Sequence, residues 1–205
     1  MNNTIEAVIY LAKCAVNDEK VEFDPSWNLD EIYALSSRHS IAAMIGMSLQ
    51  SAGVSTPDFK TAVARAQRKT VILEEERRVV TEALDKAGIW HMALKGSILK
   101  DYYPRFGMRE SADCDILFDR SFEEDVRNIM TTLGYSCESY GHGHHDVYYK
   151  PPVTNMQMHV ELFGVGFEKR LNDYYKDVKD RLIHKNGLEY GFKNEDFYIY
   201  MIAHE

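Results

Sequence analysis

LKGSILKDYYPRFGMRESADCDILF, residues 94–118, is the stretch that decides the fold. It opens at the end of an apolar run, turns at a Gly-Ser pair, continues with a helical pattern, and ends on Asp113-Cys114-Asp115 before three large apolar residues. Short apolar runs bounded by turn residues are typical of buried strands, and a periodic run between them is typical of a helix. The stretch therefore predicts a strand, a turn, a helix and a second strand.

The two aspartates of the second strand are spaced for a shared site. Because side chains alternate along a strand, Asp113 and Asp115 point to one face and Cys114 to the other. Two carboxylates held this close repel each other in a partly buried site, and a divalent cation offsets the repulsion. Mg²⁺ bound to nucleotide phosphates suits oxygen ligands of this kind. Taken alone, the pair is more typical of a solvated strand end or turn.

The turn before the helix has the features of a phosphate-binding segment. Gly96 lets the backbone come close to a phosphate, amides at the start of the helix can face it, and the Ser97 hydroxyl can donate to it. Lys95 and Arg109 can add positive charge, although both also fit ordinary solvated positions.

A later run, residues 157–163, predicts a strand that places Gln157, His159 and Glu161 on one face. Glu161 supplies a third acid. His159 fits three roles: a buried core residue, a residue that supports another side chain, or a substrate contact.

These elements resemble the nucleotidyltransferase superfamily of the DNA polymerase beta type, and within it a bacterial family of uncharacterised nucleotidyltransferases. That family shows LKG, a helix with Tyr-Pro, R-x-x-x-D-x-D, and later an acid-x-H-x-x-L strand. The chain has these elements at Leu94-Lys95-Gly96, Tyr103-Pro104, Arg109 to Asp115, and His159 to Leu162. A weaker similarity covers Trp27 and the run from Arg38 to Ile41.

The resemblance implies a Mg²⁺-dependent enzyme that transfers a nucleoside monophosphate from a nucleoside triphosphate to a hydroxyl acceptor and releases pyrophosphate. The acceptor would be a small molecule, a protein or RNA. The residues implied are Asp113, Asp115 and Glu161 as catalytic ligands of two Mg²⁺ ions, Lys95, Gly96, Ser97 and Arg109 as nucleotide-binding residues, and His159 as a substrate contact.

One departure from the family pattern keeps an alternative open. The family register places its acid at Gln157, whose amide cannot act as a carboxylate ligand. Either Glu161 takes that role from two residues beyond His159, or the chain is a catalytically inactive relative that binds a nucleotide or a protein partner.

The fold class predicted from the whole chain is α+β: a nucleotidyltransferase fold, with a small mixed sheet flanked by helices. We expect an N-terminal helical subdomain in residues 1–70, a core in residues 71–193, and a truncated C-terminal helical part that begins at residue 194 and continues beyond the sequence. Predicted strands are residues 90–94, 112–118, 136–140, 146–150 and 157–163; predicted helices include residues 4–16, a helix capped by Asn28, and residues 40–52, 57–87, 97–103, 122–133 and 195–205.

Composition narrows the classes of partner. The net charge of −8 disfavours extended tracking of nucleic acid, so small molecules or proteins are the expected partners. The three cysteines form no CxxC pair, which argues against a disulfide framework or a cysteine zinc site. No apolar run reaches the roughly 20 residues that a bilayer helix needs, so we expect a soluble, cytoplasmic protein with no membrane partner.

Two local clusters allow more than one interpretation. Residues 141–146, Gly-His-Gly-His-His-Asp, favour a hairpin turn, with a Zn²⁺ site, and hence a zinc hydrolase, or a loop near the substrate as alternatives. The basic residues between Arg65 and Arg78 alternate with Glu74, Glu75 and Glu76, which favours a salt-bridged solvent face over a phosphate-binding surface.

Overall fold

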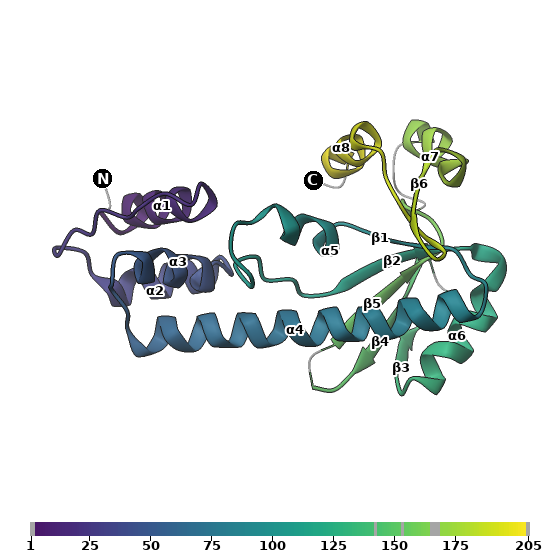
Figure 1. The fold of residues 1–205 in the computed structure, drawn as a ribbon, viewed down its shortest axis with the longest axis horizontal. Helices are drawn as coiled ribbons and strands as arrows, with labels where there is room; N and C mark the ends of the chain where they lie inside the picture. Colours follow the sequence, from purple (N-terminus) through teal and green to yellow (C-terminus); the bar gives the residue numbers. More distant parts are fainter. Residues whose placement is uncertain (1–2, 142, 153, 165–168, 204–205) are drawn as a thin grey trace. The chain divides into compact units, whose positions relative to one another are not determined.

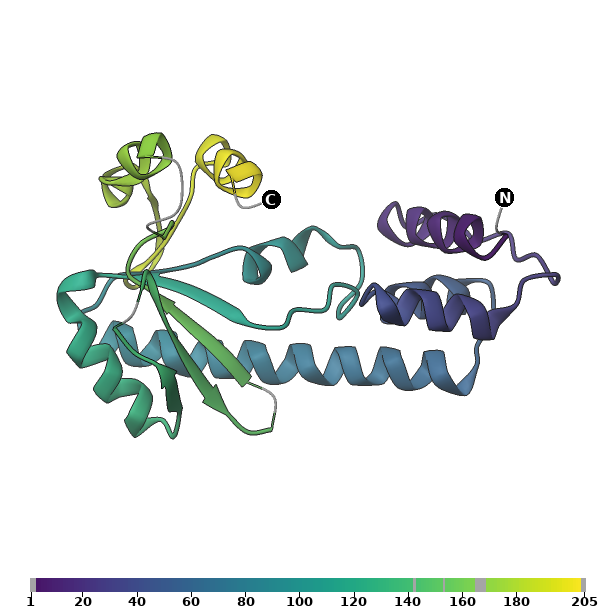
Figure 2. The ribbon, with the colours of Figure 1, turned by 180° about the vertical axis from the view of Figure 1, so that it is seen from behind.

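The structure is a computed structural model that describes residues 3–141, 143–152, 154–164 and 169–203. The chain divides into two compact units (Figures 1 and 2). The helical unit contains the chain up to Ile72 together with Leu99–Ser111, and the sheet unit contains Leu73–Ile98 and the chain from Ala112 onward. The predicted boundaries at residues 70 and 193 remain sequence-based expectations. None of the described helices has the length and hydrophobicity needed to cross a bilayer.

The helical unit is built from amphipathic helices that share one core. Its helices are α1 (Asn3–Val16), α2 (Leu29–Arg38), α3 (Ala42–Ser51) and the first half of α4 (Pro57–Lys86). The Asn28 side chain accepts from the amides of Asp30 and Glu31, which confirms the predicted cap of α2. The fully buried members of the core are Leu11, Ile32, Ile45, Leu49 and Phe59.

The sheet unit confirms the predicted α+β class with a mixed sheet. Its described strands form one seven-stranded sheet in the order β3-β4-β5-β2-β1-β7-β6. The central strand β2 pairs antiparallel with β1 and parallel with β5. The strands are β1 (His91–Ala93), β2 (Cys114–Phe118), β3 (Ser136–Ser139), β4 (His145–Lys150), β5 (Thr154–His159), β6 (Ile183–Asn186) and β7 (Glu189–Gly191); the helices are α5 (Gly96–Leu99), α6 (Glu123–Thr132), α7 (Lys169–Tyr175) and α8 (Asn194–Ala203).

Helices cover both faces of the sheet, and β2 contributes to both cores. Cys114, Ile116 and Phe118 of β2 pack in one cluster with the second half of α4 and with α6. Leu117 packs in another cluster with residues of α7 and α8. The alternation predicted for this strand is thus present, and Asp115 shares the face of Leu117.

Three segments differ from the sequence predictions. The strand predicted at 157–163 runs from Thr154 to His159, because the amides of Val160 and Glu161 both donate to the His144 carbonyl and leave the strand ladder. The helix predicted at 97–103 is a short α5 followed by a 3₁₀ helix, Lys100–Tyr102. The strand predicted to begin at residue 112 begins at Cys114.

The β6–β7 hairpin and α7 were not predicted. The hairpin turns at Gly187 and Leu188, and Gly187 has φ +54°, a left-handed value that favours glycine. Glycine at the first position of a two-residue loop is a hairpin signal, so the sequence did contain the information. β7 extends the sheet by pairing parallel with β1.

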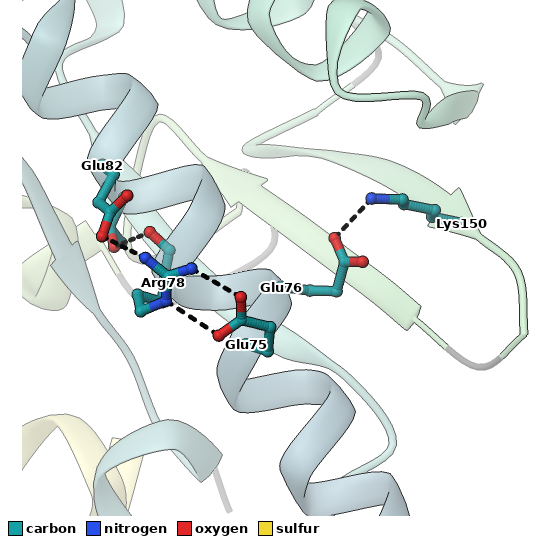
Figure 3. Close-up of polar contacts among 6 residues, drawn as sticks. Glu75, Glu76, Arg78, Glu82 and Lys150 are labelled. Atoms are coloured by element: carbon teal, nitrogen blue, oxygen red, sulfur yellow. Dashed lines mark hydrogen bonds and ion pairs between the residues drawn. The ribbon is translucent and has the colours of Figure 1, made fainter.

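Charged side chains on the second half of α4 form two kinds of contact (Figure 3). Arg78 pairs with Glu75 and Glu82 on the solvent side, which confirms the predicted salt-bridged face for this residue. Glu76 instead reaches the sheet, where its Oε2 accepts from Lys150 Nζ at 2.9 Å and from the Tyr135 hydroxyl at 2.8 Å. These contacts tie α4 to β4.

We expect Lys150→Met to lower the free energy of unfolding by about 1–2 kcal/mol, because it removes a charged donor from a carboxylate that is only 19% exposed. The matched control is Arg78→Met, whose guanidinium is 53% exposed and whose loss should cost less than about 1 kcal/mol. Urea unfolding of both variants measures the difference. Equal losses would show that the Lys150–Glu76 contact contributes no more to stability than the exposed contacts of Arg78.

Candidate active site

The two aspartates lie at the start of β2 and contact the neighbouring strand β5. Asp113 directly precedes β2 and is half-buried, whereas Asp115 lies within it and is 4% exposed. Asp113 Oδ2 accepts from Gln157 Nε2 at 3.1 Å, and Asp115 Oδ1 lies 2.9 Å from His159 Nε2. The structure therefore brings both carboxylates together with Gln157 and His159.

The environment of Asp115 favours its ionised form. Burial raises the pKa of this carboxyl group, but the hydrogen bond with His159 and the electrostatic effects of His159, Lys95 and His145 outweigh that effect. The net pKa is lowered from its ordinary value. Asp115 is consequently a carboxylate at neutral pH and can serve as a cation ligand.

Tyr200 of α8 is a neighbour of this carboxylate that the sequence did not identify. It is fully buried, and its pKa is raised first by burial and then by the negative charge of Asp115. The phenol therefore stays protonated. The sequence presented Tyr200 only as one apolar position of a terminal helix, with no local sign of the aspartate 85 positions earlier.

The Lys95-Gly96-Ser97 turn lies next to the aspartate pair. The Leu94 amide donates to the Asp115 carbonyl at 2.9 Å, which fixes the start of the turn against β2. The Ser97 hydroxyl lies 3.3 Å from Cys114 Sγ, and the Ser97 amide donates to the Leu94 carbonyl. The structure thus brings the turn to the site, with the hydroxyl directed at the cysteine between the two aspartates.

Lys95 has an unusual backbone conformation. Its φ is +37°, a left-handed value that a residue with a side chain adopts at a cost of about 1–3 kcal/mol. Its ammonium group is close enough to lower the pKa of Asp115. Strained residues cluster at functional sites, so the conformation of Lys95 draws attention to the same turn.

Arg109 belongs to the helical unit, in the segment Leu99–Ser111. Its Nη1 donates to Ser111 Oγ at 2.7 Å.

Glu161 lies beyond the end of β5 and is not brought to the aspartate pair. Its side chain is 49% exposed and forms a salt bridge with Arg120. In the parallel pairing of β2 and β5, the residue level with Asp115 is Gln157, four positions before Glu161. Four residues of extended chain span about 13 Å. The place that the family register gives to an acid is therefore held by the Gln157 amide.

Three histidines gather beside Asp115. The residues are His144, His145 and His159. One ring nitrogen of each lies within 4.8 Å of the corresponding nitrogens of the other two. His145 is the first residue of β4, and His144 directly precedes it. The antiparallel pairing of β3 with β4 confirms the predicted hairpin, and the Gly141 amide donates to Asp146 Oδ1 at 2.7 Å across it. His142, part of the same sequence cluster, lies outside the described residues.

The environment of His145 favours a neutral ring. Burial lowers its pKa, as do the electrostatic effects of His159 and Lys95, and together they outweigh the carboxylates of Asp115 and Asp146. A neutral imidazole keeps a nitrogen lone pair that can bind a metal ion.

Comparison with known proteins identifies a family. A family model described as "Uncharacterised nucleotidyltransferase" matches residues 25–205, which include all the site residues above. No curated protein and no solved structure shows significant similarity to the chain.

Proposed function

The chain belongs to the uncharacterised nucleotidyltransferase family, and we propose that it transfers a nucleoside monophosphate from a nucleoside triphosphate to a hydroxyl acceptor and releases pyrophosphate. One observation carries the proposal: an ionised Asp115 and a neighbouring Asp113 lie beside the Lys95–Ser97 turn. The backbone hydrogen bond from Leu94 to Asp115 holds this turn against β2. Family membership suggests a transferase; the geometry supplies the residues.

The donor set fits Mg²⁺ carried in with a nucleotide. Mg²⁺ is usually held by one or two carboxylates together with substrate phosphates and water. The bond to His159 engages only Oδ1 of Asp115, so this carboxylate has a second oxygen for the ion. When bound, the ion would neutralise the triphosphate and stabilise the departing pyrophosphate.

The chain's own residues have separate roles in this proposal. Asp113 and Asp115 hold the ion, Gly96 allows the backbone to approach the phosphates, and Lys95 places positive charge beside them. Ser97 fixes the turn through Cys114. The role of Arg109 at the phosphates stays a prediction from the sequence. The acceptor hydroxyl oxygen forms the new bond to the α-phosphorus as the bond to pyrophosphate breaks.

The position of Gln157 changes the proposed number of ions. A two-ion site needs enough carboxylates to bridge both cations. Glu161 lies away from Asp113 and Asp115, so it does not supply a third carboxylate. We therefore propose one Mg²⁺ held by Asp113 and Asp115. The same observation supports a second candidate, a protein that binds Mg²⁺ and nucleotide without transfer.

Incubation with each α-labelled nucleoside triphosphate, Mg²⁺ and a panel of hydroxyl acceptors tests the first candidate. The expected result is labelled acceptor together with an equal amount of pyrophosphate. Nucleotide binding without either product would support the second candidate and contradict the first. The acceptor that becomes labelled identifies its class: small molecule, protein or RNA.

Gln157→Glu is expected to tighten Mg²⁺ binding at least about tenfold, which corresponds to about 1.4 kcal/mol. The substitution places a third carboxylate next to Asp113, and a unit charge at about 4 Å from a cation contributes more than this even at a surface-like dielectric. Isothermal titration with Mg²⁺ and a non-hydrolysable triphosphate measures the change.

The control for Gln157→Glu is Gln50→Glu, which adds the same charge at an exposed position of α3 in the helical unit. Its Mg²⁺ affinity should equal that of the wild type. If both variants bind Mg²⁺ equally, Gln157 does not border the ion.

A further inference from the structure

The three-histidine cluster has contacts that the proposed transfer reaction does not use. The His144 and His145 rings are 4.5 Å apart between centroids, and the His159 ring lies 4.8 Å from His145 and 5.6 Å from His144. They come from the start of β4 and the end of β5, which pair antiparallel with His145 opposite His159. Strand pairing therefore holds two of the rings side by side, and the residue before β4 adds the third.

The two nitrogens of His159 have different surroundings. Nε2 contacts Asp115 Oδ1 at 2.9 Å, whereas Nδ1 is buried and has no hydrogen-bond partner within the described part of the chain. The ring is 1% exposed, so bulk water does not satisfy Nδ1. A buried polar atom without a partner is costly and calls for an explanation.

In metal-binding histidines the two ring nitrogens also have different partners. One nitrogen binds the metal, and the other donates its proton to a carboxylate that fixes the tautomer and the orientation of the ring. In a neutral ring, donation from Nε2 to Asp115 leaves a lone pair on Nδ1. An ion at Nδ1 would satisfy the orphaned atom.

The spacing between one ring nitrogen of His144 and one of His145 fits a tetrahedrally coordinated ion. His145 Nδ1 lies 3.1 Å from His144 Nε2. Two nitrogens on Zn²⁺ at 2.0–2.1 Å are separated by about 3.3 Å in a tetrahedron. The nitrogens of all three histidines lie within 4.8 Å of one another, so tetrahedral spacing requires shifts of no more than about 1.5 Å.

We propose that His144, His145 and His159 bind one Zn²⁺-class transition-metal ion, each through one ring nitrogen, with Asp115 as the carboxylate that orients His159. Imidazole ligands favour zinc and related ions over Mg²⁺, which prefers oxygen. None of the three zinc ligands is a proposed Mg²⁺ ligand, but Asp115 contacts both sites because it orients His159. A filled histidine site therefore holds Asp115 in place through His159. The inference does not rest on nucleotidyl transfer.

The test uses the full chain, stripped of metal and free of nucleotide. The protein is incubated with Zn²⁺, passed over a desalting column, and its retained zinc measured; a competing chromophoric chelator gives the affinity. Co²⁺ replaces Zn²⁺ in a second experiment, and its visible spectrum reports whether nitrogens surround the ion tetrahedrally. The expected result is about one ion per chain with a tetrahedral Co²⁺ spectrum.

Four variants identify the ligands. His144→Ala and His145→Ala, both at partly exposed positions, are each expected to weaken Zn²⁺ binding by more than about tenfold, the lower limit for loss of an outer-sphere partner. His39→Ala removes an exposed histidine that caps α2, and Asp113→Asn removes a carboxylate of the proposed Mg²⁺ site. Both should retain wild-type affinity. Circular dichroism verifies that all four are folded.

The inference is overturned if the wild type retains no zinc, or if zinc binding survives both histidine substitutions. It is also overturned if Asp113→Asn abolishes zinc retention while His145→Ala does not, because the ion would then occupy the carboxylates. Since no nucleotide is present, none of these outcomes depends on whether the protein transfers nucleotides.

Discussion

Asp115→Asn is expected to reduce nucleotidyl transfer at least about a hundredfold while leaving the protein folded. Asparagine has the size of aspartate and retains an oxygen that can accept from His159, so the buried hydrogen bond persists. It lacks the negative charge that binds the cation. Loss of about 3 kcal/mol of charge stabilisation in the transition state corresponds to a little over a hundredfold in rate.

Pyrophosphate release at saturating nucleotide, measured over a range of Mg²⁺ concentrations, gives the effect. Asp58→Asn, an exposed carboxylate in the first turn of α4, is the matched control and should retain the wild-type rate. Thermal unfolding of both variants separates a chemical effect from a loss of structure. A folded Asp115→Asn protein with the wild-type rate would exclude Asp115 as a ligand of the reacting nucleotide's ion.

Ile116→Ala is expected to lower the free energy of unfolding of the sheet unit by about 2–5 kcal/mol. Ile116 is fully buried in β2, where it packs in the cluster that joins the sheet to α4 and α6. Truncation leaves a cavity between elements whose backbones cannot all move inward. Because domains of ordinary size are stable by about 5–15 kcal/mol, this one change removes a large part of the total.

Urea unfolding followed by far-ultraviolet circular dichroism measures this loss. Ile183→Ala is the control, because Ile183 lies in β6 with half of its surface exposed and should change the stability by less than about 0.5 kcal/mol. If Ile116→Ala costs no more than Ile183→Ala, the packing described for β2 is wrong.

The local sequence pattern is enough to predict most of the sheet core and the central part of the candidate site. Alternation around Asp115 is enough to predict which residues of β2 face which way, since a strand has a fixed period of two. Apolar periodicity likewise predicts α4 and α6. The family register placed the expected acid position at Gln157, and the pairing of β2 with β5 shows that this residue lies level with Asp115. Glu161 was favoured only because it is the nearest acid on the same strand pattern.

What the sequence did not reveal are contacts between segments far apart in the chain. Nothing in the residues around Tyr200 indicates that α8 carries a phenol to Asp115, and nothing near His144 indicates that His159 lies beside it. Such contacts depend on strand order and on where strands end. The bend after His159, where two amides bond one carbonyl, removes Glu161 from the site and has no local signature.

The left-handed backbone of Lys95 sets two goals of protein engineering against each other. A glycine there would adopt φ +37° without strain, so stability alone would favour Lys95→Gly. That exchange would also remove the ammonium group that helps to keep Asp115 ionised. A version of this protein optimised for heat resistance and a version optimised for catalysis should therefore differ first at residue 95.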